Sequence, residues 1–248
     1  MSLPDPAAAA SAPARTESFA LAQGVRDTRA AFERWRGDPA GILRVWFGAA
    51  FAIAAAMLAG VWLVSLCFDG DPSPVYLVGI SEPADAGELG SILGRNLLVL
   101  ALHATACVAG FIAGSSMAQV AETKTGFSRI VHERAGPIAI GWVVLVTTAS
   151  LGTQVFGLGF DAASIARNLD IGTGLLVLTV LPHALIELTA VFLPLAAWLI
   201  ASRRGEWADL LAATFLTVLL ALPMLLVAAT IEMTVWPRLL RLASPLVG

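Results

Sequence analysis

The sequence predicts an all-α fold, a polytopic transmembrane helix bundle of about five spans, on three observations. First, 58% of the 248 residues are hydrophobic and only 13% are charged, whereas about a quarter of the residues of a soluble domain are charged. Second, the mean hydropathy is +0.81. Third, five apolar runs are each long enough to cross a bilayer, which takes about 20 residues. Together these observations predict a multi-pass membrane protein.

The N-terminal region is predicted to lie outside the bilayer. Residues 1–15 are rich in Ala and Pro and lack any pattern that could be buried, so we expect a disordered tail. Residues 16–43 are predicted to contain a cytoplasmic amphipathic helix. Its apolar positions include Phe32 and Trp35, and its arginines suit anionic headgroups. The alternative is a helix that packs under the bundle or onto a cytoplasmic partner.

The bundle itself is assigned to residues 44–248. An acidic loop rich in Pro and Gly follows the first span. The second span contains Gly110 and Gly114, whose spacing allows close helix packing. The predicted spans lie near residues 45–68, 96–117, 137–160, 173–202 and 209–236.

The fourth span carries polar residues inside an apolar run that is about half as long again as a bilayer requires. We therefore expect either a strongly tilted helix or a helix break at Pro182. His183 and Glu187 are four residues apart and share one helix face. Ionisable groups in hydrocarbon are costly and favour a functional site. A structural polar clamp between helices is an equally good interpretation.

The orientation is predicted from the basic residues. With the N-terminus inside, eleven Lys and Arg residues fall on the cytoplasmic side and four on the outer side. The positive-inside rule then favours a cytoplasmic N-terminus and an outer C-terminus.

Helix length and direction predict an intramembrane polar cluster near the outer side of the bundle. A salt bridge from an arginine to one of its glutamates is the simplest structural interpretation. The predicted members are Arg95, Asn96, His103, Gln154, His183, Glu187 and Glu232.

No motif predicts catalysis. The sequence has no HExxH arrangement, no phosphate-binding loop and no readable Ser/His/Asp set, and it lacks a basic-aromatic pattern for nucleic acid. We therefore expect no catalytic residue, no metal, no cofactor and no nucleic-acid partner. The two cysteines, Cys67 and Cys107, do not form a disulfide framework and are expected to pack in the first two spans.

The segment LPHALIELTAVFLPLAAWLIASRRG resembles the signature of the SpoIIM-like (stage II sporulation protein M) membrane proteins, with His183 and Glu187 at matching positions and Ala184 where that family has Gly. The Asn96 that opens an early Gly-rich span and the Glu232 that precedes Pro237 are also similar. The resemblance covers most of the chain from Asn96 onward.

The resemblance implies a bacterial cytoplasmic membrane protein and two classes of function. One is a non-enzymatic scaffold or anchor for an envelope or cell-wall-remodelling complex, with a cell-wall hydrolase as a possible partner. The other is the permease subunit of an ABC-type exporter, in which a homodimer works with a separate cytoplasmic ATPase. The expected cytoplasmic docking residues for such a partner are Lys124, Arg129, Glu133 and Arg134.

Overall fold

The computed structural model describes residues 14–116 and 126–247. For residues 14–22, 115–116, 127–137 and 139 it describes the backbone only. These residues form helices and no β-strand. Residues 1–13 of the predicted tail (1–15) and Lys124 lie outside the described residues, whereas residues 14 and 15 begin α1. The elements are α1 (Ala14–Trp35), α2 (Pro39–Ser65), α3 (Ala86–Phe111), the π-helical turn η2 (Ile112–Ser116), α5 (Gly126–Asn168), α6 (Thr173–Arg204), the 3-10 turn η3 (Trp207–Asp209), α7 (Leu210–Thr234) and α8 (Trp236–Ala243).

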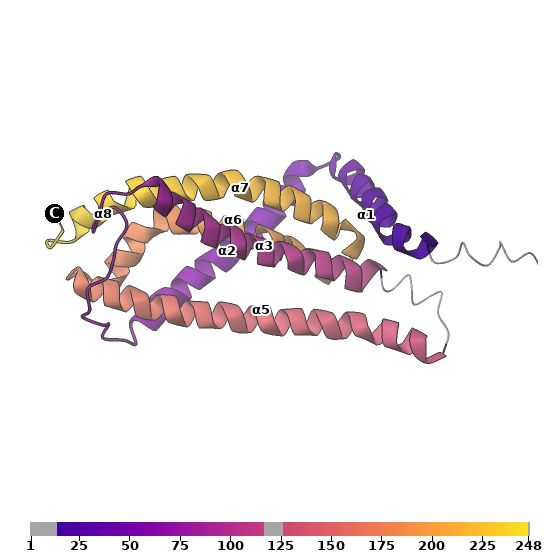
Figure 1. Cartoon of the computed structure of the whole chain (residues 1–248), viewed down its shortest axis with the longest axis horizontal. Helices are drawn as coiled ribbons and strands as arrows, with labels where there is room; N and C mark the ends of the chain where they lie inside the picture. The colour runs from indigo at the N-terminus through magenta and orange to yellow at the C-terminus, as the bar shows by residue number, and fades with distance from the viewer. Residues whose placement is uncertain (1–13, 117–125, 248) are drawn as a thin grey trace, which may run out of the picture.

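Five helical segments of the described chain are long and apolar enough to cross a membrane, which confirms the predicted multi-pass helix bundle. The five spans alternate in direction along the bundle, so α1 lies at one end and α8 at the opposite end (Figure 1). We call these the α1 end and the α8 end.

Helix boundaries differ from the prediction where polar residues cap a helix. The helix predicted within residues 16–43 corresponds to α1, which stops at Trp35, and α2 begins at Pro39. The side chain of Asp38 accepts a hydrogen bond from the Gly41 amide at 2.8 Å, and Pro39 suits a first helical turn. Similarly, a capping box between Asp85 and Glu88 starts α3 ten residues before the predicted span.

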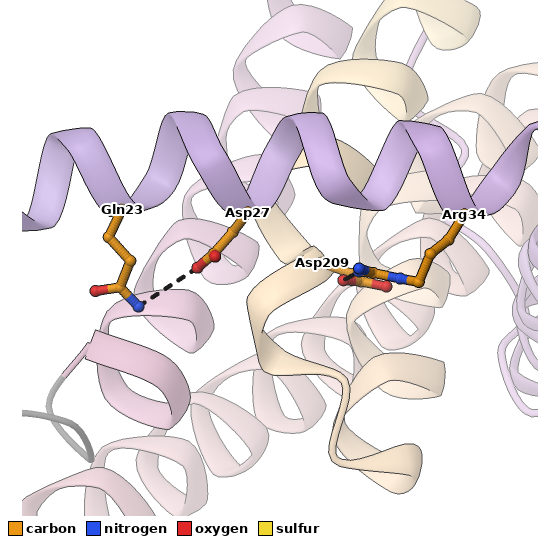
Figure 2. Close-up of polar contacts among 4 residues, drawn as sticks. All are labelled: Gln23, Asp27, Arg34 and Asp209. Carbon is orange, nitrogen blue, oxygen red and sulfur yellow. Dashed lines mark hydrogen bonds and ion pairs between the residues drawn. The ribbon is translucent and has the colours of Figure 1, made fainter.

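Helix α1 packs on the bundle, as the alternative interpretation of this segment predicted. Ala31 is fully buried, and the ring of Phe32 meets Phe215 of α7 edge to face at 6.4 Å. Figure 2 shows the side chain of Arg34 reaching from α1 to Asp209, with which it forms an ion pair. The same view shows the hydrogen bond from Gln23 to Asp27 within α1.

Helix α6 is the centre of the fold. In its most apolar window 67% of the residues are buried inside the bundle, compared with 6% for α5. The glycines of the predicted packing motif allow the close approach of α3. A Cβ atom on Gly110 would lie 2.6 Å from the indole nitrogen of Trp198, and one on Gly114 would lie 2.4 Å from the ring of Trp207.

The loop between α2 and α3 is fastened to the α8 end. Arg167 of α5 donates hydrogen bonds to the carbonyls of Asp69 and Gly70, at 3.2 and 3.0 Å. Asn168 donates to the carbonyl of Asp71 at 3.0 Å. Gly70 has a positive φ of 72°, and a Cβ atom there would lie 2.5 Å from the carbonyl oxygen of Ala163. The loop therefore touches the backbone of α5 directly.

Candidate functional site: an intramembrane acidic cavity

A cavity of about 270 Å³ lies between the spans in the half of the bundle nearer the α8 end. Its wall is mostly apolar, with side chains such as Leu158 and Val180. The ionisable groups that line it come from three helices: Asp161 of α5, His183 and Glu187 of α6, and Glu232 of α7. Three of these four were members of the predicted polar cluster.

The two glutamates line the same cavity, Glu187 from α6 and Glu232 from α7. Within the described part of the chain, however, Arg95 forms no ion pair with either glutamate, so the predicted salt bridge is not formed. Two neighbouring carboxyls without a paired cation are suited to holding a proton or a cationic group between them.

Two further polar groups of the cavity wall lack partners. His183 is only 6% exposed, and its Nδ1 atom is buried without a hydrogen-bond partner in the described chain. The same holds for the indole nitrogen of Trp236, whose ring lies 5.6 Å from that of His183. A buried polar atom without a partner costs about 1 to 3 kcal/mol, so this cavity is poorly satisfied as it stands.

The predicted helix break at Pro182 is wrong, because α6 continues from Thr173 to Arg204 through both Pro182 and Pro194. A proline removes one backbone hydrogen bond of the helix. Membrane helices tolerate this loss when neighbouring groups satisfy the carbonyls that are released.

Near Pro194, α3 makes two polar contacts with backbone carbonyls of α6. His103 Nδ1 lies 2.8 Å from the carbonyl oxygen of Val191. The thiol of Cys107 donates to the carbonyl oxygen of Pro194 at 3.1 Å. His103 therefore has a structural contact with α6 and does not line the acidic cavity.

Gln154 is also separate from the acidic cavity. Together with His103 it lines a cleft of about 410 Å³ between α3 and α5. The α5 wall of this cleft carries Thr147, Ser150 and Gln154, and Gln154 donates a hydrogen bond to the Ser150 hydroxyl at 3.1 Å. Of the predicted cluster, His183, Glu187 and Glu232 therefore line the acidic cavity, His103 and Gln154 line the cleft between α3 and α5, and Arg95 and Asn96 line neither.

The predicted cytoplasmic docking residues fall at the start of α5. Arg129, Glu133 and Arg134 lie in its first turns, at the α1 end, where only the backbone is described.

No group of three or more His, Cys, Asp or Glu residues in the described chain could hold a metal ion. The carboxyl groups of Asp161, Glu187 and Glu232 in the cavity wall are of the kind that bind protons or amines.

No family model, no curated protein and no solved structure matches this chain. The similarity to the SpoIIM-like signature stays a prediction from the residues quoted above.

Sequence reasoning missed three residues that matter to these sites. Asp161 and Trp236 line the acidic cavity, but neither belongs to the predicted cluster. Pro194 was not singled out, although a second proline inside the long apolar run is visible in the sequence.

Proposed function

We propose that this chain is a non-enzymatic scaffold of the bacterial cytoplasmic membrane, which anchors a component of an envelope or cell-wall-remodelling complex. The proposal includes a cytoplasmic N-terminus, an outer C-terminus and assembly as a homo-oligomer, with a dimer as the simplest form. It rests on the residue pattern that resembles the SpoIIM-like family and on one feature of the bundle.

That feature is the polar cleft between α3 and α5. Thr147, Ser150 and Gln154 line it at a depth where lipid tails would otherwise contact them. Hydroxyl and amide groups in hydrocarbon are stabilised by hydrogen bonds to another helix. A transmembrane helix of a partner, with a polar residue facing Gln154, would satisfy these groups. The outward face of α5 supports this interpretation, because it carries exposed apolar side chains such as Val144 and Leu145.

A photo-crosslinking amino acid placed at Ser150 tests this proposal in native membranes. We expect a discrete protein adduct from Ser150, identified by mass spectrometry as an envelope protein, and a weaker adduct when Gln154→Leu is added. The matched control places the same group at Leu222, which is 43% exposed on α7 and outside the cleft. Lipid adducts alone at both positions would contradict partner docking, and so would an adduct only to a second copy.

The acidic cavity supports a second candidate function, the permease subunit of an ABC-type exporter. Ionisable residues inside a bundle are typical of substrate and ion pathways. Glu187, Glu232 and His183 would contact the transported group, and the start of α5 would bind the ATPase. A dimer would be required, since five spans per chain are few for a pathway.

Purification from the host in nanodiscs distinguishes the two candidates. A stoichiometric ATPase in the preparation would favour the exporter, and reversal of both charges at Glu133 and Arg134 should then release it. Retention of the ATPase by that double variant would contradict this docking site. If no ATPase is retained by the unmodified protein, the exporter candidate is wrong.

A further inference from the structure

A larger cavity, of about 550 Å³, lies at the α1 end, outside both sites described above. It is formed where the end of α1 and the start of α2 meet the end of α6 and the start of α7. Two tryptophans, Trp35 and Trp46, line it and pack edge to face with ring centroids 5.2 Å apart. Tryptophans of this kind are enriched where a helix passes from hydrocarbon to headgroups.

Six charged side chains line this cavity, and the internal contacts of three of them are known. Arg34 and Asp209 form the ion pair between α1 and the start of α7. The carboxylate of Asp38 caps α2.

The remaining three are Arg44, Arg204 and Glu206, and in the described chain they form no ion pair. With Asp38 counted, the six side chains carry three positive and three negative charges, so the cavity has no net charge. Its two guanidinium groups without an ion-pair partner, on Arg44 and Arg204, can bind phosphate oxygens through paired hydrogen bonds.

The other part of the wall is apolar. Ile42 and Val45 of α2 and Ala197 and Ile200 of α6 line it. These residues belong to spanning segments, so they continue toward the hydrocarbon core. A ligand that fits this cavity therefore has a phosphate at one end and a hydrocarbon chain at the other.

We propose that this cavity binds an anionic phospholipid, with its phosphodiester held by Arg44 and Arg204 and an acyl chain along the α2 and α6 wall. This inference is independent of the proposed scaffold function. Because Arg34 and Trp35 of α1 line the same cavity, the bound lipid also contacts α1 and stabilises its packing on the bundle.

Native mass spectrometry of the full-length protein in detergent, titrated with phosphatidylglycerol or phosphatidylcholine, tests the proposal. We expect one phosphatidylglycerol molecule to be retained and phosphatidylcholine to bind more weakly. Each arginine near a membrane surface contributes about 1 kcal/mol toward an anionic lipid. Arg44→Gln and Arg204→Gln should therefore each weaken phosphatidylglycerol binding about fivefold.

Arg203→Gln is the matched control, because Arg203 is exposed in the same last turn of α6 but does not line the cavity. It should leave the affinity unchanged. Equal weakening by Arg203→Gln would indicate diffuse surface attraction and overturn the site. Equal affinity for the two lipids in the unmodified protein would also overturn it, without relying on any variant. Competition by inorganic phosphate at the lipid concentration would show a simple anion site.

Discussion

The two ends of the bundle are held together by different kinds of contact. At the α8 end, side chains of α5 and α8 donate hydrogen bonds to backbone carbonyls of the loop, including Arg241 to Gly79 at 2.8 Å. Ser244 donates to the carbonyl of Leu169 at 2.5 Å. At the α1 end, the described contacts of α1 with the bundle are the ion pair between Arg34 and Asp209, aromatic edge contacts and the packing of the buried Ala31.

This difference indicates which end can move. Hydrogen bonds to backbone carbonyls fix the path of a loop and depend little on salt. An ion pair with one half-exposed partner is weakened by salt, and aromatic contacts between helices allow sliding. We therefore expect α1 to leave the bundle more readily than the loop between α2 and α3 leaves α5. Four experiments test this comparison.

The largest effect is expected from Gly70→Ala at the α8 end. The residue has a positive φ of 72°, and the added Cβ would lie 2.5 Å from a backbone oxygen of α5 that cannot move aside easily. Strain and overpacking together should lower the free energy of unfolding by about 2 to 4 kcal/mol. Thermal unfolding and hydrogen exchange of the loop measure this. Gly94→Ala, with nothing within 4 Å of its Cβ position, should not destabilise, and equal loss in both variants would contradict the contact.

The next effect is expected from Gly110→Ala, on the contact of α3 with α6 toward the α1 end. The added Cβ would lie 2.6 Å from the indole nitrogen of Trp198, a side chain that can shift in part. Overpacking should cost about 1 to 3 kcal/mol. The unfolding midpoint and the emission of Trp198 report the change. Gly157→Ala on α5 has an empty surrounding and serves as control; an unchanged midpoint for Gly110→Ala would refute close packing here.

A smaller effect is expected from Arg34→Gln at the α1 end. The side chain of Arg34 is 55% exposed and that of Asp209 is 14% exposed, so the pair should contribute at most about 1 kcal/mol. Hydrogen exchange of residues 24–35 should become faster, and the difference from the unmodified protein should shrink in high salt. Arg29→Gln breaks an exposed pair with Glu33 inside α1 and should not detach the helix. Faster exchange in Arg29→Gln alone would be the contrary result.

The smallest effect concerns pH at the α8 end. The hydrogen bond to Glu88 raises the pKa of the exposed Tyr76 from 10.0 to about 12. A raised pKa in the folded protein means that the contact contributes fully below pH 10 and is lost as the pH rises toward 12. Loop hydrogen exchange, corrected for its intrinsic pH dependence, should therefore increase over this interval. Tyr76→Phe should remove that alkaline step, and its persistence in the variant would assign the step to another group.

At acidic pH the same loop has an opposite dependence. The hydrogen bond from the Ser73 amide lowers the pKa of Asp71 below 3.8. Its contribution is therefore present above pH 3.8 and is lost as the pH falls through the lowered pKa.

The sequence predicted the bundle well because hydropathy alone identifies spanning helices. It did not predict which polar residues meet, because residue spacing does not give the rotation of each helix about its axis. His183 and Glu187 share a face by their spacing, and they do line one cavity. His103 and Gln154 have a similar predicted depth, but they line a different cleft, between α3 and α5. The sequence gives the position of each side chain along its helix, whereas its direction required the structure.

The length of α5 has a mechanical consequence. Its 43 residues correspond to about 65 Å of helix, about twice the hydrocarbon thickness of a bilayer. The segment before its apolar window therefore extends about 20 Å along the helix axis beyond Ile140 at the α1 end. α5 packs against the bundle core as far toward the α1 end as Ile140, so the helical segment before that residue acts as a lever arm. A small tilt of α5 within the bundle would become a larger displacement of the tip of this segment, in proportion to its distance from the pivot.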